Sequence, residues 1–283
     1  MLSYRHAFHA GNHADVLKHL VVHEILQYMN QKEKPWWYID THAGAGRYDL
    51  TAGFATKNAE YNTGIGKLWE KSDLPLALSR FIDTIRADNP NGELANYPGS
   101  PWVASKSLRV EDKLRLFELH PSDAELLEAV FAEARLVGTG KPALVQKANG
   151  FAGLKSVLPP PPRRALILID PPYEDKQDYQ TVVKAVEDGL HRFATGTFAI
   201  WYPKLQRPGW LAMVEKLKQL PCKSWLNASL EVEVPREDGF GMFGSGMFIV
   251  NPPYTLKDTL TDVLPYLAKQ LGSDGPGKWV LES

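Results

Sequence analysis

The stretch Ala165-Leu166-Ile167-Leu168-Ile169-Asp170-Pro171-Pro172-Tyr173 decides the fold. It begins with a continuous apolar run, which is typical of a strand buried on both faces of a parallel sheet, and it ends in a rigid polar turn. Four further apolar runs of the same kind occur along the chain, at residues 36–40, 114–118, 143–145 and 197–202. Together these runs predict the strands of one parallel sheet.

Helical segments separate these strands. A capping box, Ser122-Asp123-Ala124-Glu125, predicts the start of a helix over residues 124–134. Residues 177–193 and 210–220 have the apolar spacing of two more helices. Because strands and helices alternate, the sequence predicts an α/β domain with a doubly wound, Rossmann-like sheet.

The C-terminal third has a different pattern. Apolar residues alternate with polar ones from 226 to 234, a glycine-rich turn covers 239–246, and another apolar run occupies 247–250. This pattern predicts an antiparallel hairpin at the edge of the sheet. With this hairpin, we expect seven strands, most of them parallel.

An insertion interrupts the alternation of strands and helices after the first strand. More than seventy residues separate the first strand from the second, far more than a crossover needs. Ser100 as N-cap and Pro101 at the first helical position indicate where the crossover helix begins. Residues 48–97 are therefore predicted to form an inserted, lid-like helical subdomain within a single domain that covers residues 1–283.

The motif Asp170-Pro171-Pro172-Tyr173 follows a buried strand, at the sheet edge where α/β proteins bind ligands. An amino group on an aromatic ring is a poor nucleophile, because its lone pair is delocalised into the ring. The Asp170 carboxylate and a backbone carbonyl exposed by the Pro171 turn can accept both N–H hydrogens and favour a pyramidal nitrogen. Tyr173 offers a face on which a flipped-out base can stack. The motif therefore predicts methyl transfer to the exocyclic amino group of adenine.

A second motif follows the first strand: Asp40-Thr41-His42-Ala43-Gly44-Ala45-Gly46. Its glycines, Gly44 among them, allow a ligand to approach the backbone closely. Glu118, at the end of the second strand, is a natural acceptor for two ribose hydroxyls. Asn149 and Gly150 follow the third strand, where an amide can bond the adenine of a cofactor; a plain turn at this position is the alternative.

Composition limits the other possibilities. The net charge is −1, so any nucleic acid must bind through a local patch. One cysteine, Cys222, and the absence of a long apolar stretch predict a reduced, cytoplasmic protein with no membrane partner. His9 and His13 have the i, i+4 spacing of zinc ligands, but nothing completes a metal motif. We expect no metal; Lys18 and His19 are better suited to hold a polar or anionic ligand.

Taken jointly, several motifs resemble those of the bacterial 23S ribosomal RNA adenine-N6 methyltransferase family. They are Met1-Leu2-Ser3-Tyr4-Arg5-His6, the block 8–19, 40–48, Tyr97-Pro98-Gly99-Ser100-Pro101, 118–123 and 170–173. The resemblance extends over essentially the whole chain. It implies a class I methyltransferase fold with a helical insertion, S-adenosylmethionine as cofactor, and methylation of one adenine N6 in 23S rRNA.

The resemblance also implies roles for individual residues. The cofactor would be bound by residues from five parts of the chain: His19, His42, Ser100, Glu118 and Gly150. Asp170 would touch the cofactor and accept the proton, and Tyr4 would lie beside the target base. The chain departs from the family pattern at Asn149, where an aspartate is expected. An amide can still accept a hydrogen bond from the cofactor, so at most a weaker contact follows.

Phosphate contacts are expected near the catalytic edge of the sheet. Parallel strands bring Lys204 to the same edge as Asp170, and the N-terminal block would add Arg5. We therefore expect Arg5 and Lys204 to bind the RNA backbone, and no obligate protein partner. Arg163 and Arg164 precede their strand, so they should lie at the opposite edge and contribute little.

The sequence alone leaves other functions to be considered. A DNA adenine-N6 methyltransferase would use the same four-residue motif. NAD binding is disfavoured, because a dinucleotide fingerprint requires glycine where Asp49 stands. A non-catalytic RNA-binding protein would not need Asp170. Asn251-Pro252-Pro253-Tyr254 repeats the motif, but it follows a strand predicted to be antiparallel, so we interpret it as a turn.

Overall fold

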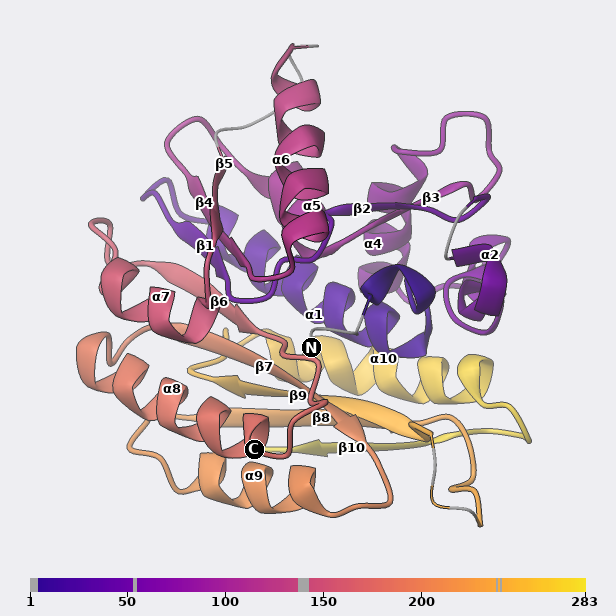
Figure 1. The fold of residues 1–283 in the computed structure, drawn as a ribbon. Coiled ribbons are helices and arrows are strands. Elements are labelled where there is room, and N and C mark those ends of the chain that lie inside the picture. The colour runs from indigo at the N-terminus through magenta and orange to yellow at the C-terminus, as the bar shows by residue number, and fades with distance from the viewer. Residues whose placement is uncertain (1–4, 53–54, 137–142, 238, 240) are drawn as a thin grey trace.

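The protein is described here by a computed structural model, which covers residues 5–52, 55–136, 143–237, 239 and 241–283. A central sheet of eight strands has the order β10-β8-β9-β7-β6-β1-β4-β5 (Figure 1). The strands are β1 (Trp37–Asp40), β4 (Lys113–Glu118), β5 (Ala143–Lys147), β6 (Ala165–Ile169), β7 (Thr197–Lys204), β8 (Trp225–Glu231), β9 (Gly244–Val250) and β10 (Lys278–Glu282). From β5 to β7 every pairing is parallel, as the apolar runs predict.

The C-terminal strands complete the sheet. β9 lies antiparallel between β7 and β8, so the predicted hairpin is present but inserts one strand into the sheet. The sheet has eight strands rather than seven, because β10 pairs with β8 and forms the edge. β10 has only five residues, all but one of them exposed, so its sequence carries no buried-strand pattern. The fold is an α/β, Rossmann-like fold with a mostly parallel central sheet.

Helices cover both faces of the sheet (Figure 1). On one face lie α7 (Gly150–Val157), α8 (Asp178–Arg192) and α9 (Gly209–Lys218). On the other lie α1 (His13–Asn30), α5 (Ser100–Ser107), α6 (Pro121–Leu136) and α10 (Leu256–Leu271). The alternation along β6 separates the two cores: Leu166 and Leu168 face the core of α1, whereas Ile167 and Ile169 face that of α8. Within the described residues, no helix is long and apolar enough to span a membrane.

The segment between β1 and α5 is framed by two short antiparallel strands, β2 (Arg47–Asp49) and β3 (Asn96–Pro98). Between them lie α2 (Ala55–Asn58), the 3-10 helix η2 (Glu60–Thr63), α3 (Gly66–Trp69) and α4 (Leu76–Arg86). Leu68 and Phe81 are fully buried in the core shared with α1 and α10. This packing gives no support to a lid-like role, because these helices are part of the main core.

Two helix starts differ from the prediction. α6 begins at Pro121, so Ser122 lies inside the helix and the predicted capping box is wrong. α5 begins at Ser100 with Gly99 as N-cap, so Ser100 does not cap the helix. Its hydroxyl instead donates a hydrogen bond of 2.6 Å to Asp40. A hydrogen bond to a charged carboxylate is stronger than one between neutral groups, so the hydroxyl of Ser100 points toward Asp40.

Candidate active site

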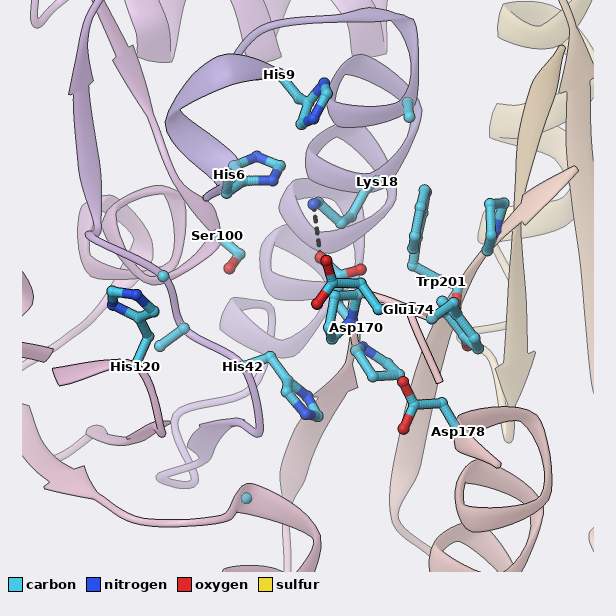
Figure 2. A pocket seen from close by; sticks show the side chains of 18 of the residues that line it. His6, His9, Lys18, His42, Ser100, His120, Asp170, Glu174, Asp178 and Trp201 are labelled. Carbon is cyan, nitrogen blue, oxygen red and sulfur yellow. Dashed lines mark hydrogen bonds and ion pairs between the residues drawn. The ribbon is translucent and has the colours of Figure 1, made fainter. Parts of the chain in front are cut away.

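A cavity of about 1050 Å³ opens where the carboxyl ends of the parallel strands meet α1 (Figure 2). Eleven of the residues singled out from the sequence line it: Lys18, His19, His42, Gly44, Ser100, Glu118, Asn149, Gly150, Asp170, Pro171 and Tyr173. These residues come from six separate segments of the chain, and four of the segments lie at the carboxyl ends of β1, β4, β5 and β6, where the strand-end argument placed them. Tyr4 lies outside the described residues.

Lys18 reaches Asp170 from α1. The side chain of Asn12 caps this helix by accepting from the amides of Ala14 and Asp15, which fixes the first turn. One turn later the buried Lys18 ammonium lies 2.6 Å from Asp170 Oδ2 (Figure 2). Burial disfavours the charge of Lys18, but the two carboxylates beside it hold its pKa above the ordinary value. In the described part of the chain, Asp170 Oδ1 accepts no hydrogen bond and is available to a ligand.

Asp15 was not identified as a site residue from the sequence. Its carboxylate is 1% exposed and lies 2.9 Å from the Lys18 ammonium. Burial alone would raise the pKa of Asp15, yet the neighbouring His6 and Lys18 hold it well below the ordinary value. The signal available in the sequence was its place in the polar block 8–19, three residues before Lys18 and therefore on the same helix face.

A second buried carboxylate, that of Asp40, lies at the end of β1. Asp40 accepts hydrogen bonds from Tyr38 at 2.8 Å and from Ser100 at 2.6 Å. Burial raises the pKa of Asp40 to about 6, in spite of these hydrogen bonds. Asp40 also accepts from the His42 amide at 3.1 Å, so it fixes the start of the loop that follows β1. Gly44 follows in the left-handed conformation (φ 60°), where a Cβ atom would lie 2.5 Å from the Tyr48 hydroxyl.

Glu118 holds the glycine loop to β4. Its two carboxylate oxygens accept from the amides of Gly44 at 2.8 Å and His120 at 2.7 Å. Burial raises the pKa of Glu118, and the amide donors partly oppose that effect. The carboxylate is half-buried and lines the cavity, so each oxygen retains a lone pair for a hydroxyl of a ligand.

Asn149 and Gly150 lie side by side at the start of α7. Asn149 caps the helix, because its side-chain oxygen accepts from the Ala152 amide at 3.2 Å. A Cβ atom at Gly150 would lie 2.0 Å from the carbonyl oxygen of Thr41, so only glycine permits this approach of α7 to the first loop. His42 packs edge-on against Phe151, and burial lowers its pKa to about 3.

Tyr173 does not present the open face that its motif suggested. The residue is 7% exposed, and its ring packs against Tyr179 and Trp201 at centroid distances of 4.7 and 6.0 Å. Its hydroxyl donates to the carbonyl of Trp201 at 2.7 Å. Tyr173 therefore anchors the turn to β7. Trp201 lines the cavity beside it and was not among the predicted site residues.

The expected phosphate contacts are not supported at Lys204. Its ammonium is buried, lies 2.6 Å from Glu231 and stacks over Trp210, because the alternation along β7 turns the side chain away from the cavity. Arg5 is half-buried and pairs with Asp123 at 3.0 Å. Lys176, in the loop after Tyr173, lines the cavity and is exposed.

The second Pro-Pro-Tyr motif lies at the opposite edge of the sheet, because β9 is antiparallel as predicted. Asn251 adopts φ 52°, and its amide donates to the carbonyls of Ala194 and Gly196, both at 2.9 Å. This motif is therefore a structural turn.

The predicted i, i+4 histidine pair contains His9, whose ring lies 2.8 Å from Glu60. No group of three potential metal ligands occurs among the described residues.

The chain is similar to known proteins over nearly its full length. Residues 33–282 match the family model described as "Ribosomal RNA large subunit methyltransferase D, RlmJ". A protein of Haemophilus influenzae named ribosomal RNA large subunit methyltransferase J is 47% identical over 283 residues, which are 100% of this chain and 98% of the relative. The protein of the same name from Escherichia coli is 47% identical over 277 residues, 98% of this chain and 96% of the relative.

One solved structure has the same architecture. A protein of Legionella pneumophila superimposes with a TM-score of 0.87 at 34% sequence identity, and the match covers 97% of this chain and 98% of that one. The eight-stranded sheet and the insertion framed by β2 and β3 therefore belong to a shared fold.

Proposed function

Because the chain belongs to the RlmJ family of ribosomal RNA large subunit methyltransferases, we propose that it methylates the N6 amino group of one adenine in 23S rRNA. The observation that carries this proposal is the Asp170 carboxylate, fixed by Lys18 at the centre of the cavity with one oxygen available to a ligand. An aromatic amino group requires such an acceptor. A protein that acts on ribosomal RNA would work in the cytoplasm, where ribosomes are assembled.

The cavity suits S-adenosylmethionine on one side of Asp170. Ser100, His42 and His120 lie on this side, and Trp201 lies on the other (Figure 2). Glu118 would accept from both ribose hydroxyls, and Gly44 and Gly150 line the cavity where the cofactor would contact the backbone. The remaining contacts would come from Lys18, His19, His42, Ser100 and Asn149. When bound, the cofactor supplies a methyl group activated by its sulfonium.

The residues of the chain prepare the nucleophile. The free oxygen of Asp170 and a backbone carbonyl of the Pro171 turn would accept the two N6 hydrogens, which directs the nitrogen lone pair toward the methyl group. Lys18 holds Asp170 in place for this contact. After transfer, Asp170 would take the proton that the nitrogen releases. Tyr173 supports the turn through its hydroxyl, and Trp201 borders the side on which the base would enter.

The test is a transfer assay with tritiated S-adenosylmethionine. Protein-free 23S RNA, assembled large subunits and duplex DNA are offered side by side, and the product nucleoside is identified after digestion. We expect label in N6-methyladenosine from RNA. Label in DNA alone would support the DNA adenine-N6 methyltransferase instead, and no label in any substrate would contradict the proposal.

A further inference from the structure

Asp15 contacts both the N-terminal segment and Lys18, which in turn pairs with Asp170. One of its oxygens accepts from the Gly11 amide at 2.9 Å and lies 2.9 Å from His6 Nε2. The other oxygen lies 2.9 Å from the Lys18 ammonium. The side chain is 1% exposed, so water does not replace any of these contacts. Asp15 is thus the only charged group on α1 that contacts Lys18 directly in the described structure.

Lys18 lies between two carboxylates, Asp15 at 2.9 Å and Asp170 at 2.6 Å. Asp15 belongs to α1, whereas Asp170 follows β6. The two carboxylates therefore restrain the Lys18 ammonium from two separate elements. His6 pairs with Asp15 itself. Three other groups lie around the ammonium within the described residues: His19, which burial keeps neutral, Tyr48 and the ring of Trp201. None of these three provides a second carboxylate that could take the place of Asp15.

We propose that Asp15 is a positioning residue for methyl transfer: its carboxylate holds the Lys18 ammonium where Asp170 requires it. Both oxygens of Asp15 lie against groups of the protein itself, namely the Gly11 amide, His6 and Lys18. Asp15 acts through Lys18, and it ties the backbone at Gly11 to the same point. This inference rests on the proposed function, since the geometry that it maintains is that of the Asp170 acceptor.

The test is Asp15→Asn, which keeps an acceptor for the Gly11 amide but removes the charge that holds Lys18. We expect kcat to fall by about 10- to 100-fold, the cost of a misplacement of about 1 Å in a catalytic group. The KM for RNA should change by less than about threefold, because the contacts that bind RNA equally in the ground state and the transition state are not affected. In a Lys18→Met background, Asp15→Asn should add little to the loss.

The pH dependence separates positioning from structural support. Without Asp15, burial of Lys18 is opposed by Asp170 alone, so the pKa of Lys18 falls. The variant should therefore lose turnover at a lower alkaline pH than the wild type does. A variant that merely packs poorly would lose activity equally at all pH values.

Glu24→Gln is the matched control. Glu24 is also a buried carboxylate of α1 paired with a cation, Arg80 at 2.8 Å, but it does not line the cavity. Its neutralisation should lower stability without changing the pH profile or kcat of the folded fraction. The inference is overturned if Asp15→Asn behaves as Glu24→Gln does, or if it keeps wild-type kcat. If the wild type itself transfers no methyl group to RNA, the proposed function fails instead.

Discussion

The ammonium of Lys18 lies 2.6 Å from Oδ2 of Asp170, although 152 residues separate the two along the chain. The contact joins the first turns of α1 to the turn after β6. The contact brings the polar block near the N-terminus and the Pro-Pro-Tyr motif of residues 170–173 together at one cavity. Each segment supplies one charge of this buried pair.

The first prediction compares the two Pro-Pro-Tyr sites. Asp170→Asn keeps the shape of the turn but weakens the acceptor and its pair with Lys18. It should lower methyl transfer by at least about 100-fold and leave the affinity for S-adenosylmethionine within a few fold. Single-turnover assays and calorimetry measure the two quantities.

Asn251→Ala is the control for Asp170→Asn. It removes two hydrogen bonds to carbonyls, each contributing about 1 kcal/mol, so it should lower stability rather than turnover. Loss of turnover in Asn251→Ala with normal turnover in Asp170→Asn would contradict the assignment of the site.

The second prediction concerns cofactor affinity. Glu118→Ala removes the carboxylate proposed to accept from both ribose hydroxyls, and it also frees the Gly44 amide. Binding of S-adenosylmethionine should weaken by about 1.5–3 kcal/mol, the scale of a hydrogen bond to a charged group. Calorimetry should show no binding of NAD to the wild type. Glu125→Ala, at an exposed position of α6, is the control, and equal affinities of the two variants would refute the role of Glu118.

The strand-end argument placed Asp170, Glu118 and Gly150 at one edge of the sheet, and all three line the cavity there, because the carboxyl ends of parallel strands meet at one edge. It did not predict side-chain direction. Lys204 lies at the expected edge, yet the period-two alternation of β7 turns it toward Glu231. Asp15 escaped notice because its importance depends on a contact between Lys18 and a residue far along the chain, and no local pattern records such a pairing.

Local signals also failed where a tertiary contact outweighed them. Ser100 has the sequence context of an N-cap, but its hydroxyl donates to the buried Asp40. The capping box at Ser122 is incorrect because Pro121 starts the helix earlier, as its fixed φ allows. β10 was missed because its exposed residues carry no apolar run, and its pairing with β8 is visible only once the sheet is assembled.

The third prediction uses the pKa of Asp40, which burial raises to about 6. A raised folded-state pKa stabilises the fold fully below the unfolded value of about 3.9, and this contribution is lost as the pH rises through about 6. Relative to Asp40→Asn, the wild type should therefore lose up to about 3 kcal/mol of unfolding free energy between pH 4 and pH 7. Denaturant titrations at several pH values measure the difference. A difference that stays constant with pH would show that Asp40 titrates normally.

The last prediction concerns how a chain with net charge −1 holds a polyanion. Lys176 is exposed on the cavity wall, so we expect it to contact a phosphate; Lys204 is paired with Glu231 inside the protein. Lys176→Ala should make the slope of log affinity against log salt shallower by about 0.7–0.9 units, as one phosphate contact is lost. Lys204→Ala should lower stability and leave the slope unchanged. Arg163→Ala, at the opposite edge, is the control, because its exposed side chain precedes β6. An equal change of slope in Arg163→Ala would mean that the RNA extends around the sheet, and phosphate binding would then not be confined to the edge that contains Asp170.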